Sequence, residues 1–333
     1  MAEKNYAGAM LDVLGSFMEE DPHFAVLGNE VLGIGPEGAQ FEPFQKRYGD
    51  RIYFPPCSEA AYTALAAGAA MCGHRIFAHL GLASFTYPAI SSLANEISTA
   101  RVSSGGTIGV PATLHISHGL LHGGGAQHSD SPFSSYWNLP GIEIAVPSGA
   151  REVKGLLRTA LESENPTIVL THAFGYGLTD EVPDEDYSIP FGVADLKRTG
   201  GDVTIVACST MVGVALEAAG ELAGQGIEAE VVDLRTLVPL DERTILDSVG
   251  KTGRLIVVDE GRMRCGVASE IAATVSEKAF AALKAPVGRV ARLDAPVAAN
   301  QIQEAYISPS AEKIVAAAKR SVGEVPAGGV SGG

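Results

Sequence analysis

The chain has 333 residues, of which 46% are hydrophobic and only 19% are charged, so it can bury the cores of two domains. Its formal net charge of −15 disfavours binding to nucleic acid or to an anionic membrane surface, since both attract basic proteins. Its four cysteines lack paired spacing and Met1-Ala2-Glu3-Lys4 leads directly into a helical pattern, so we expect a reduced, cytoplasmic protein without a membrane span.

Helical and strand patterns alternate along the first half of the chain. Apolar spacing predicts helices over residues 6–19, 58–72, 87–102 and 148–161, and strands over residues 24–27, 76–80, 108–115, 142–146 and 167–170. Ser58 stands at a predicted helix N-cap, and the small residues after it allow close packing of the backbone, as at a tight helix–helix contact. The alternation predicts a parallel sheet wrapped by helices.

A second series of elements follows residues 171–200, which lack periodicity and are interpreted as a linker. The predicted strands cover residues 203–207, 228–234, 255–258 and 287–293, and the predicted helices cover residues 211–224, 242–249 and 267–283. The predicted fold class is therefore α/β with two doubly wound domains, residues 1–185 and 186–325. Residues 326–333 are expected to form a flexible tail.

Two motifs carry only weak functional signals. Residues 33–38 match the dinucleotide pattern G-x-G-x-x-G, but residues 28–32 separate them from the preceding strand, so a glycine-rich surface loop is the better interpretation. His115, His118, His122 and His128 lie close together in sequence, yet no carboxylate or cysteine falls among them. They favour hydrogen bonding or proton donation over metal binding.

Glu59 and His128 are the strongest candidates for catalysis. Glu59 stands in Pro55-Pro56-Cys57-Ser58-Glu59, where a short strand gives way to a helix, and His128 lies in a glycine-rich loop. A desolvated carboxylate is costly unless it has a use, and an acid and an imidazole on two loops of an α/β sheet suggest proton transfer. The simpler alternatives are an acid that favours the helix dipole and an ordinary hydrogen-bonded histidine.

Longer motifs, in a fixed order, resemble one family. They are Ser58-Glu59-Ala60, Gly68-Ala69-Ala70-Met71-Cys72-Gly73, Ala83-Ser84-Phe85-Thr86-Tyr87-Pro88-Ala89, Ser104-Gly105-Gly106, Ala126-Gln127-His128-Ser129, Val232-Asp233-Leu234-Arg235-Thr236-Leu237-Val238-Pro239-Leu240-Asp241 and Val257-Val258-Asp259-Glu260-Gly261. The chain resembles the β subunit of the thiamine-diphosphate-dependent decarboxylase component of 2-oxo acid dehydrogenase complexes (pyruvate, acetoin and branched-chain types), in the transketolase-like superfamily. The resemblance implies a pyrimidine-binding domain and a transketolase C-terminal-like domain.

The resemblance implies a role for each matching position. Glu59 would hydrogen-bond the aminopyrimidine of thiamine diphosphate, a task that suits a buried glutamate, and Phe85 would pack against that ring. His128 would stabilise or protonate the intermediate and assist acyl transfer to a lipoyl group. Ser58, Gly81 and Leu82 would also border the cofactor.

The resemblance also implies a partner. Members of this superfamily hold the diphosphate and Mg²⁺ with a G-D-G…N segment, of which Gly49-Asp50-Arg51 is the nearest trace. An α subunit should therefore hold the diphosphate and Mg²⁺, in an assembly of two α and two β subunits with helices such as 58–72 in the interface. A lipoyl acyltransferase component is a further expected partner.

Several positions depart from the family pattern. Asn29-Glu30 replaces a pair of acids, Gly81 and Leu82 replace bulkier residues, and residues 297–300 lack a Pro-aromatic pair. The substrate is accordingly left open among 2-oxo acids and acyloins such as acetoin. A turn that binds K⁺ in relatives maps to Ala160, Leu161, Ser163 and Asn165, with Ser163 in place of an aspartate.

Two other hypotheses are open. The chain could be the C-terminal half of a split transketolase-like or carboligating enzyme, although such enzymes often carry a Glu-Gln-Asn run where this chain has Glu59-Ala60-Ala61. It could also be a non-catalytic member that keeps the fold, which Asn29 and Gly81 favour. Lipoyl-dependent acyl transfer would exclude the first of these, and binding to an α-like chain without any chemistry would support the second.

Overall fold

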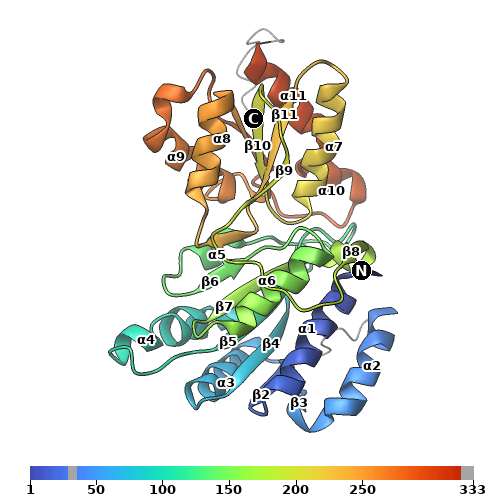
Figure 1. Ribbon diagram of the computed structural model, residues 1–333, viewed down its shortest axis with the longest axis vertical. Coiled ribbons are helices and arrows are strands. Elements are labelled where there is room, and N and C mark those ends of the chain that lie inside the picture. Colours follow the sequence, from blue (N-terminus) through green and yellow to red (C-terminus); the bar gives the residue numbers. More distant parts are fainter. Residues whose placement is uncertain (29–35, 324–333) are drawn as a thin grey trace.

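The computed structural model describes residues 1–28 and 36–323. Two lobes stack along its long axis, the amino-terminal half of the chain in the lower lobe and the carboxyl-terminal half in the upper lobe (Figure 1). Each lobe is a mainly parallel sheet with helices on both faces. The predicted tail over residues 326–333 lies outside the described residues.

A seven-stranded sheet of order β12-β6-β7-β5-β4-β2-β3 forms the lower lobe. Its strands are β2 (Phe24–Gly28), β3 (Ile52–Tyr53), β4 (Arg75–Leu82), β5 (Ala112–His118), β6 (Glu143–Ala145), β7 (Thr167–His172) and β12 (Thr236–Val238). Only the β12–β6 pair is antiparallel, so the carboxyl ends of the other strands meet at one edge. Side chains alternate between two cores: Phe24 and Val26 enter one, and Ala25 and Leu27 enter the other.

Helices cover both faces of this sheet. One core contains side chains of α1 (Tyr6–Glu20), α2 (Pro36–Tyr48) and α6 (Ala150–Glu162). The other contains Tyr62, Ala66 and Ala70 of α3 (Glu59–Met71), whose small side chains allow close packing. The short helices α4 (Ala100–Ser103) and α5 (Phe133–Trp137) complete the lobe.

The upper lobe has a five-stranded sheet of order β14-β13-β10-β11-β9, in which only β9 is antiparallel. Its strands are β9 (Asp195–Arg198), β10 (Val203–Ala207), β11 (Ala229–Asp233), β13 (Leu255–Arg262) and β14 (Gly288–Arg292). Its helices are α7 (Met211–Ala223), α8 (Glu242–Thr252), α9 (Val267–Lys278), α10 (Gln301–Ile307) and α11 (Ala311–Val322). The core beneath α8 and α9 is continuous with the core beneath α3, so the two lobes share apolar packing.

The predicted linker over residues 171–200 contains short strands that the sequence analysis did not predict. It contains β8 (Asp180–Val182), which pairs with β1 (Ala2–Lys4), and β9, which joins the upper sheet. These edge strands have three or four residues, too few for a periodic pattern to appear.

Two other segments also differ from the sequence prediction. The predicted helix over residues 87–102 is divided into a 3-10 turn (Ala83–Ala89), a π-helical turn (Ser92–Ile97) and α4, because Pro88 lacks a backbone donor and the hydroxyls of Ser98 and Thr99 bond carbonyls one turn back. The predicted surface loop over residues 33–38 is a helix from Pro36 onward, since proline is favoured at a helix start. Residues 33–35 lie outside the described residues.

Candidate functional site

The predicted site residues follow the carboxyl ends of β3, β4 and β5 in the lower sheet. Glu59 is the first residue of α3, which a short connection joins to β3. Gly81 and Leu82 end β4, Phe85 lies in the 3-10 turn after it, and His128 lies in the loop after β5. Parallel α/β sheets bind ligands at this edge, because the loops from several strands converge there.

Phe85 and His128 are in direct contact. Their ring centroids lie 5.4 Å apart in an edge-on arrangement, and the hydroxyl of neighbouring Ser84 donates to the carbonyl of Gln127. His128 is exposed and Phe85 half-buried, so the imidazole is accessible beside an apolar ring. The turn that carries Phe85 also packs against α3, the helix that begins at Glu59.

Glu59 is half-buried in the isolated chain, whereas its proposed role suits a buried glutamate. Its carboxylate lies in the first turn of α3, where the helix dipole favours negative charge, and it accepts from the Cys57 thiol 3.9 Å away. No other polar side chain in the described ranges bonds this carboxylate, so it is not hydrogen-bonded to His128. Burial and the nearby charge of Glu59 raise the pKa of Tyr62. Ser58 occupies the N-cap position, but its hydroxyl caps no amide.

The backbone conformation at position 81 favours glycine. The φ of Gly81, +76°, lies in the left-handed region, and a side chain there would begin 3.7 Å from the Phe85 ring. The absence of a side chain therefore leaves open space against Phe85. The neighbouring Leu82 is half-buried.

The loop that carries His128, residues 119–131 (the histidine loop), is tied down at its start. Glu304 of α10 accepts hydrogen bonds from the backbone amides of His122 and Gly123 and from Nδ1 of His122, all at 3.0–3.1 Å. The side chain of Gln301 donates to the His122 carbonyl. Glu304 could not be recognised from the sequence, because an acid in a short helix resembles any other surface acid.

The crowded histidines of the sequence separate in space. His115 hydrogen-bonds His79 and Thr171, whereas His118 hydrogen-bonds Ser131 and Ser209. Burial lowers the pKa of both, and the His118 value falls to about 3. Over residues 1–28 and 36–323, no group of three or more His, Cys, Asp or Glu could hold a metal ion. The arrangement therefore favours the hydrogen-bonding interpretation.

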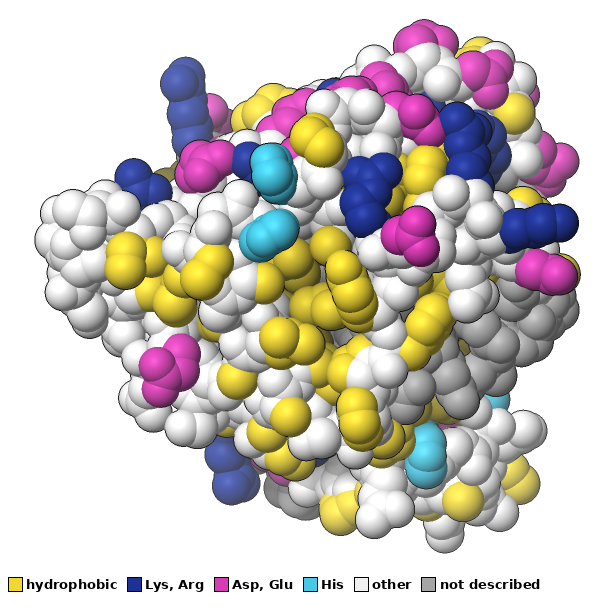
Figure 2. Space-filling view, turned by 90° about the horizontal axis from the view of Figure 1, so that it is seen from below, with side chains coloured by type: hydrophobic (Ala, Val, Ile, Leu, Met, Phe, Trp, Pro, Cys, Tyr) yellow, Lys and Arg dark blue, Asp and Glu magenta, His cyan; other side chains and the backbone are white. Residues whose placement is uncertain are grey.

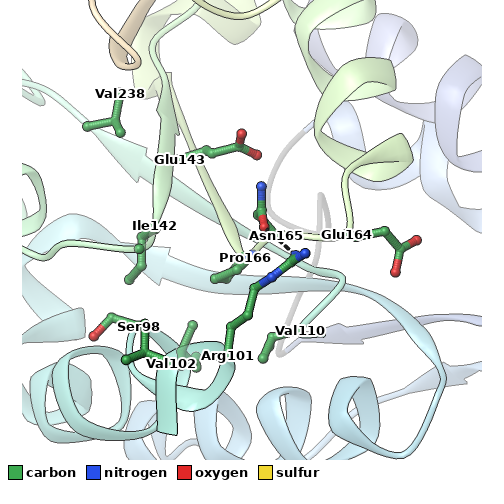
Figure 3. A pocket seen from close by; sticks show the side chains of 12 residues that line it. Ser98, Arg101, Val102, Val110, Ile142, Glu143, Glu164, Asn165, Pro166 and Val238 are labelled. Atoms are coloured by element: carbon green, nitrogen blue, oxygen red, sulfur yellow. Dashed lines mark hydrogen bonds between the residues drawn. The ribbon is translucent and has the colours of Figure 1, made fainter. Parts of the chain in front are cut away.

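The turn predicted to bind K⁺ follows α6. One guanidinium nitrogen of Arg75 donates to the Leu161 carbonyl at 2.5 Å and to the Ser163 carbonyl at 2.8 Å. Beside it, Arg101 donates to the side-chain oxygen of Asn165 at the rim of a cavity of about 240 Å³ (Figure 3). The carbonyl of the fourth predicted ligand, Ala160, accepts from the amide of Ser163. Because protein donors, two of them cationic side chains, already engage these oxygens, the turn does not fit an additional cation.

The outer side of α3 belongs to an apolar surface. Tyr53, Phe54 and Leu65 are exposed large hydrophobic residues, and with Pro55 and Ala69 they line a shallow pocket of about 440 Å³. Figure 2 shows hydrophobic side chains gathered across the middle of the lower end of the molecule, with most charged side chains toward its margin. Such a contiguous patch marks an interaction surface.

Asn29-Glu30, the substituted acid pair, lies outside the described residues. No helix in the described ranges is both long enough and apolar enough to cross a bilayer.

Comparisons with known proteins agree with this architecture. Two family models match: the transketolase pyrimidine binding domain over residues 2–176 and the transketolase C-terminal domain over residues 192–314. Acetoin:2,6-dichlorophenolindophenol oxidoreductase subunit beta of Cupriavidus necator is 39% identical over 94% of this chain and 96% of its own. Pyruvate dehydrogenase E1 component subunit beta-1, mitochondrial, of Arabidopsis thaliana is 36% identical over 96% and 89%. A solved structure described as "Split gene transketolase, inactive beta4 tetramer" has a TM-score of 0.79 at 25% identity, over 96% of this chain and 98% of that one.

Proposed function

Because this chain belongs to the transketolase-like β subunits of thiamine-diphosphate-dependent pyruvate and acetoin dehydrogenases, we propose that Glu59, Phe85 and His128 form the pyrimidine half of its cofactor site. The family and fold class predicted from the sequence are confirmed. The observation that supports the site is that all three residues follow strand ends at one edge of the lower sheet, with Phe85 and His128 in contact.

Each side chain suits a distinct part of the chemistry. Thiamine diphosphate supplies the electron sink for cleaving the bond next to a carbonyl. Among the residues that the structure describes, the Glu59 carboxylate has only a weak thiol partner, so it has acceptor positions left for a pyrimidine N–H and can hold a proton there. Phe85 offers an apolar ring surface, and the exposed imidazole of His128 can give or take a proton beside it. Ser58, Gly81 and Leu82 would border the cofactor.

The rest of the cofactor site would come from an α subunit, which the family relationship implies as partner. Gly49-Asp50-Arg51 forms a 3-10 turn without the second glycine, so the α subunit would bind the diphosphate and Mg²⁺. The apolar face around Leu65 suits that interface, because it continues from the helix that starts at Glu59. In an assembly of two α and two β subunits, atoms of the α subunit would then cover the half-buried Glu59 carboxylate of each β subunit.

Potassium would have no role in this subunit. Arg75 bonds the two carbonyls of the predicted K⁺ turn, and a guanidinium brings the same positive charge with directed donors. Arg75 would therefore take the structural place that an ion fills in relatives.

A lipoyl acyltransferase would accept the acyl group in the cytoplasm, and the substrate would be a 2-oxo acid or an acyloin. The likeness to a split-gene transketolase supports the same fold, but the dehydrogenase β subunits are more similar in sequence. Acyl transfer to lipoamide would distinguish a dehydrogenase β subunit from half of a split transketolase, because only the dehydrogenase would carry it out. Residues 1–185 and 186–325 would be the two functional domains.

Replacing Glu59 tests the proposal. In the complex reconstituted with its α subunit, we expect Glu59→Gln to reduce thiamine-diphosphate-dependent reduction of 2,6-dichlorophenolindophenol by at least about a thousandfold while leaving assembly intact. Glu312→Gln is the matched control, since Glu312 is an exposed acid in the first turn of a helix in the other lobe. An active Glu59→Gln complex would refute the assignment.

A further inference from the structure

Asp130, two residues beyond His128, is a buried carboxylate with three side-chain partners. Tyr87 donates its hydroxyl at 2.9 Å and Arg262 donates at 3.1 Å to one carboxylate oxygen, and Arg292 donates at 2.6 Å to the other. Only 4% of the Asp130 surface is exposed. Burial alone would raise the pKa of Asp130, but the bonds from Arg292, Tyr87 and Arg262 hold it below the ordinary value. The carboxylate is therefore a fixed negative charge at neutral pH.

The two arginines come from the upper lobe. Arg262 ends β13 and Arg292 ends β14, whereas Asp130 belongs to the lower lobe. Arg292 is fully buried, and in the described part of the chain its Nε and Nη1 atoms have no hydrogen-bond partner. Asp259 lies near the same positive charge, but its oxygens accept from the amides of Gly261 and Ala268. The Asp130 carboxylate is thus the hydrogen-bonded counterion of a buried cation.

Asp130 also connects the two pieces of the lower lobe that form the candidate site. Its backbone carbonyl accepts from the amide of Gly119 at 2.9 Å, which closes the histidine loop. Its side chain accepts from Tyr87, two residues beyond Phe85. Asp130 is part of the loop that presents His128, and its carboxylate bonds the turn that presents Phe85 and two strand ends of the upper lobe.

We propose that Asp130 is a positioning residue that fixes the Phe85 turn and the histidine loop relative to each other by bonding both to the Arg262–Arg292 pair of the upper lobe. This inference rests on the proposed function of Phe85 and His128. It gives the upper lobe, which contributes none of the predicted site residues, an indirect part in the reaction, through the position of Phe85 and His128. A catalytic group displaced by about 1 Å can lose about a hundredfold in rate, so the position of the loop matters.

The test compares variants in the reconstituted complex with the α subunit. We expect Asp130→Asn to lower kcat at least about tenfold, with KM within about twofold, and to speed amide exchange across residues 119–131 at least about fivefold. Tyr87→Phe, which keeps the ring and both ion pairs, should lower kcat about threefold to tenfold. The double variant Asp130→Asn with Arg292→Gln should recover part of the rate, because it removes the unpaired buried charge.

Tyr48→Phe is the matched control. Tyr48 also donates its hydroxyl to a carboxylate, Glu19, but on the α1–α2 surface away from the strand ends. If Tyr87→Phe and a folded Asp130→Asn keep wild-type kcat and exchange rates, the positioning role is refuted. If Asp130→Asn does not fold, Tyr87→Phe alone decides the outcome. Loss of turnover in Glu59→Gln alongside normal turnover in both variants would leave the proposed function standing and reject only this inference.

Discussion

At the scale of single residues, buried polar contacts join the two lobes behind the candidate site. His172 donates toward both oxygens of Glu260 at 3.0 and 3.1 Å, and Ser131 donates to the same carboxylate. Burial would raise the pKa of Glu260, but His172, His118 and Ser131 together lower it. The bonds of Glu260 to His172 and Ser131 exist only while the lobes stay together, so this network specifies the relative position of the lobes.

Gly119 marks how tightly this network is packed. A Cβ atom there would lie 2.2 Å from Nε2 of His172, and its φ is +112°. We expect Gly119→Ala to lower the free energy of unfolding by about 2–4 kcal/mol, from strain and overpacking together. Gly106→Ala separates the two terms, because Gly106 also has positive φ (+86°) but has open space around it. Equal losses in thermal unfolding of both variants would show that packing against His172 is unimportant.

Buried His118 predicts a loss of stability in mild acid. Its pKa is lowered by burial, then by His172, from an ordinary 6.5 to about 3. Between pH 6.5 and pH 3 the His118 imidazole binds a proton in the unfolded chain but not in the folded one. The contribution of His118 to the free energy of unfolding is therefore fully present above pH 6.5 and declines as the pH falls toward 3. Between pH 7 and pH 5 we expect a loss of about 2 kcal/mol from His118 alone.

His118→Asn should therefore show a smaller acid-induced loss of stability than the wild-type chain, measured by urea unfolding at pH 7 and pH 5. Exposed His23, replaced in His23→Asn, serves as control and should leave the loss unchanged. An identical loss in all three proteins would contradict the assignment.

At the scale of elements, long periodic segments were predictable and short edge strands were not. Apart from β3, β9 and β12, the strands of the two main sheets overlap predicted segments, and so do helices α1, α3, α6, α7, α8 and α9, because their apolar spacing is visible locally. In contrast, β12 follows β11 of the upper sheet in sequence but pairs with β6 of the lower sheet, a choice set by distant partners. Asp130, Arg292 and Glu304 were missed for the same reason, since only tertiary contacts distinguish them.

The turn after α6 gives a prediction at this scale. With Arg75 bonded to the Leu161 and Ser163 carbonyls, exchanging Na⁺ for K⁺ at equal ionic strength should leave the thermal unfolding midpoint unchanged. If the folded chain bound K⁺, a K⁺ concentration a hundred times the Kd would instead raise the free energy of unfolding by about 2.7 kcal/mol. Arg75→Ala should open the carbonyls and make the midpoint depend on K⁺. Stabilisation of the wild-type chain by K⁺ would show that ion and arginine coexist.

At the scale of the whole molecule, acidic charge and apolar surface are unevenly placed. The chain carries a net charge of −15, yet Tyr53, Phe54 and Leu65 are exposed and line one apolar pocket together with Pro55 and Ala69. Figure 2 shows hydrophobic side chains gathered across the lower end of the molecule. The net negative charge makes copies of this chain repel one another, which disfavours association of the chain with itself. Burial of apolar surface provides most of the favourable free energy of a stable complex. The face therefore suits a permanent partner better than a transient one.

Leu65→Asp tests whether this face binds the α subunit. Leu65 is 51% exposed, so the substitution should leave the thermal stability of the isolated chain within about 0.5 kcal/mol. In the complex it would bury an unpaired charge, so we expect binding of the α subunit to weaken at least about a hundredfold, measured by native mass spectrometry and titration. Phe280→Asp, at a 75% exposed apolar position of the upper lobe, is the control. Because the half-buried Glu59 begins the same helix, loss of the complex should also abolish cofactor-dependent turnover; normal assembly of Leu65→Asp would place the α subunit on another face.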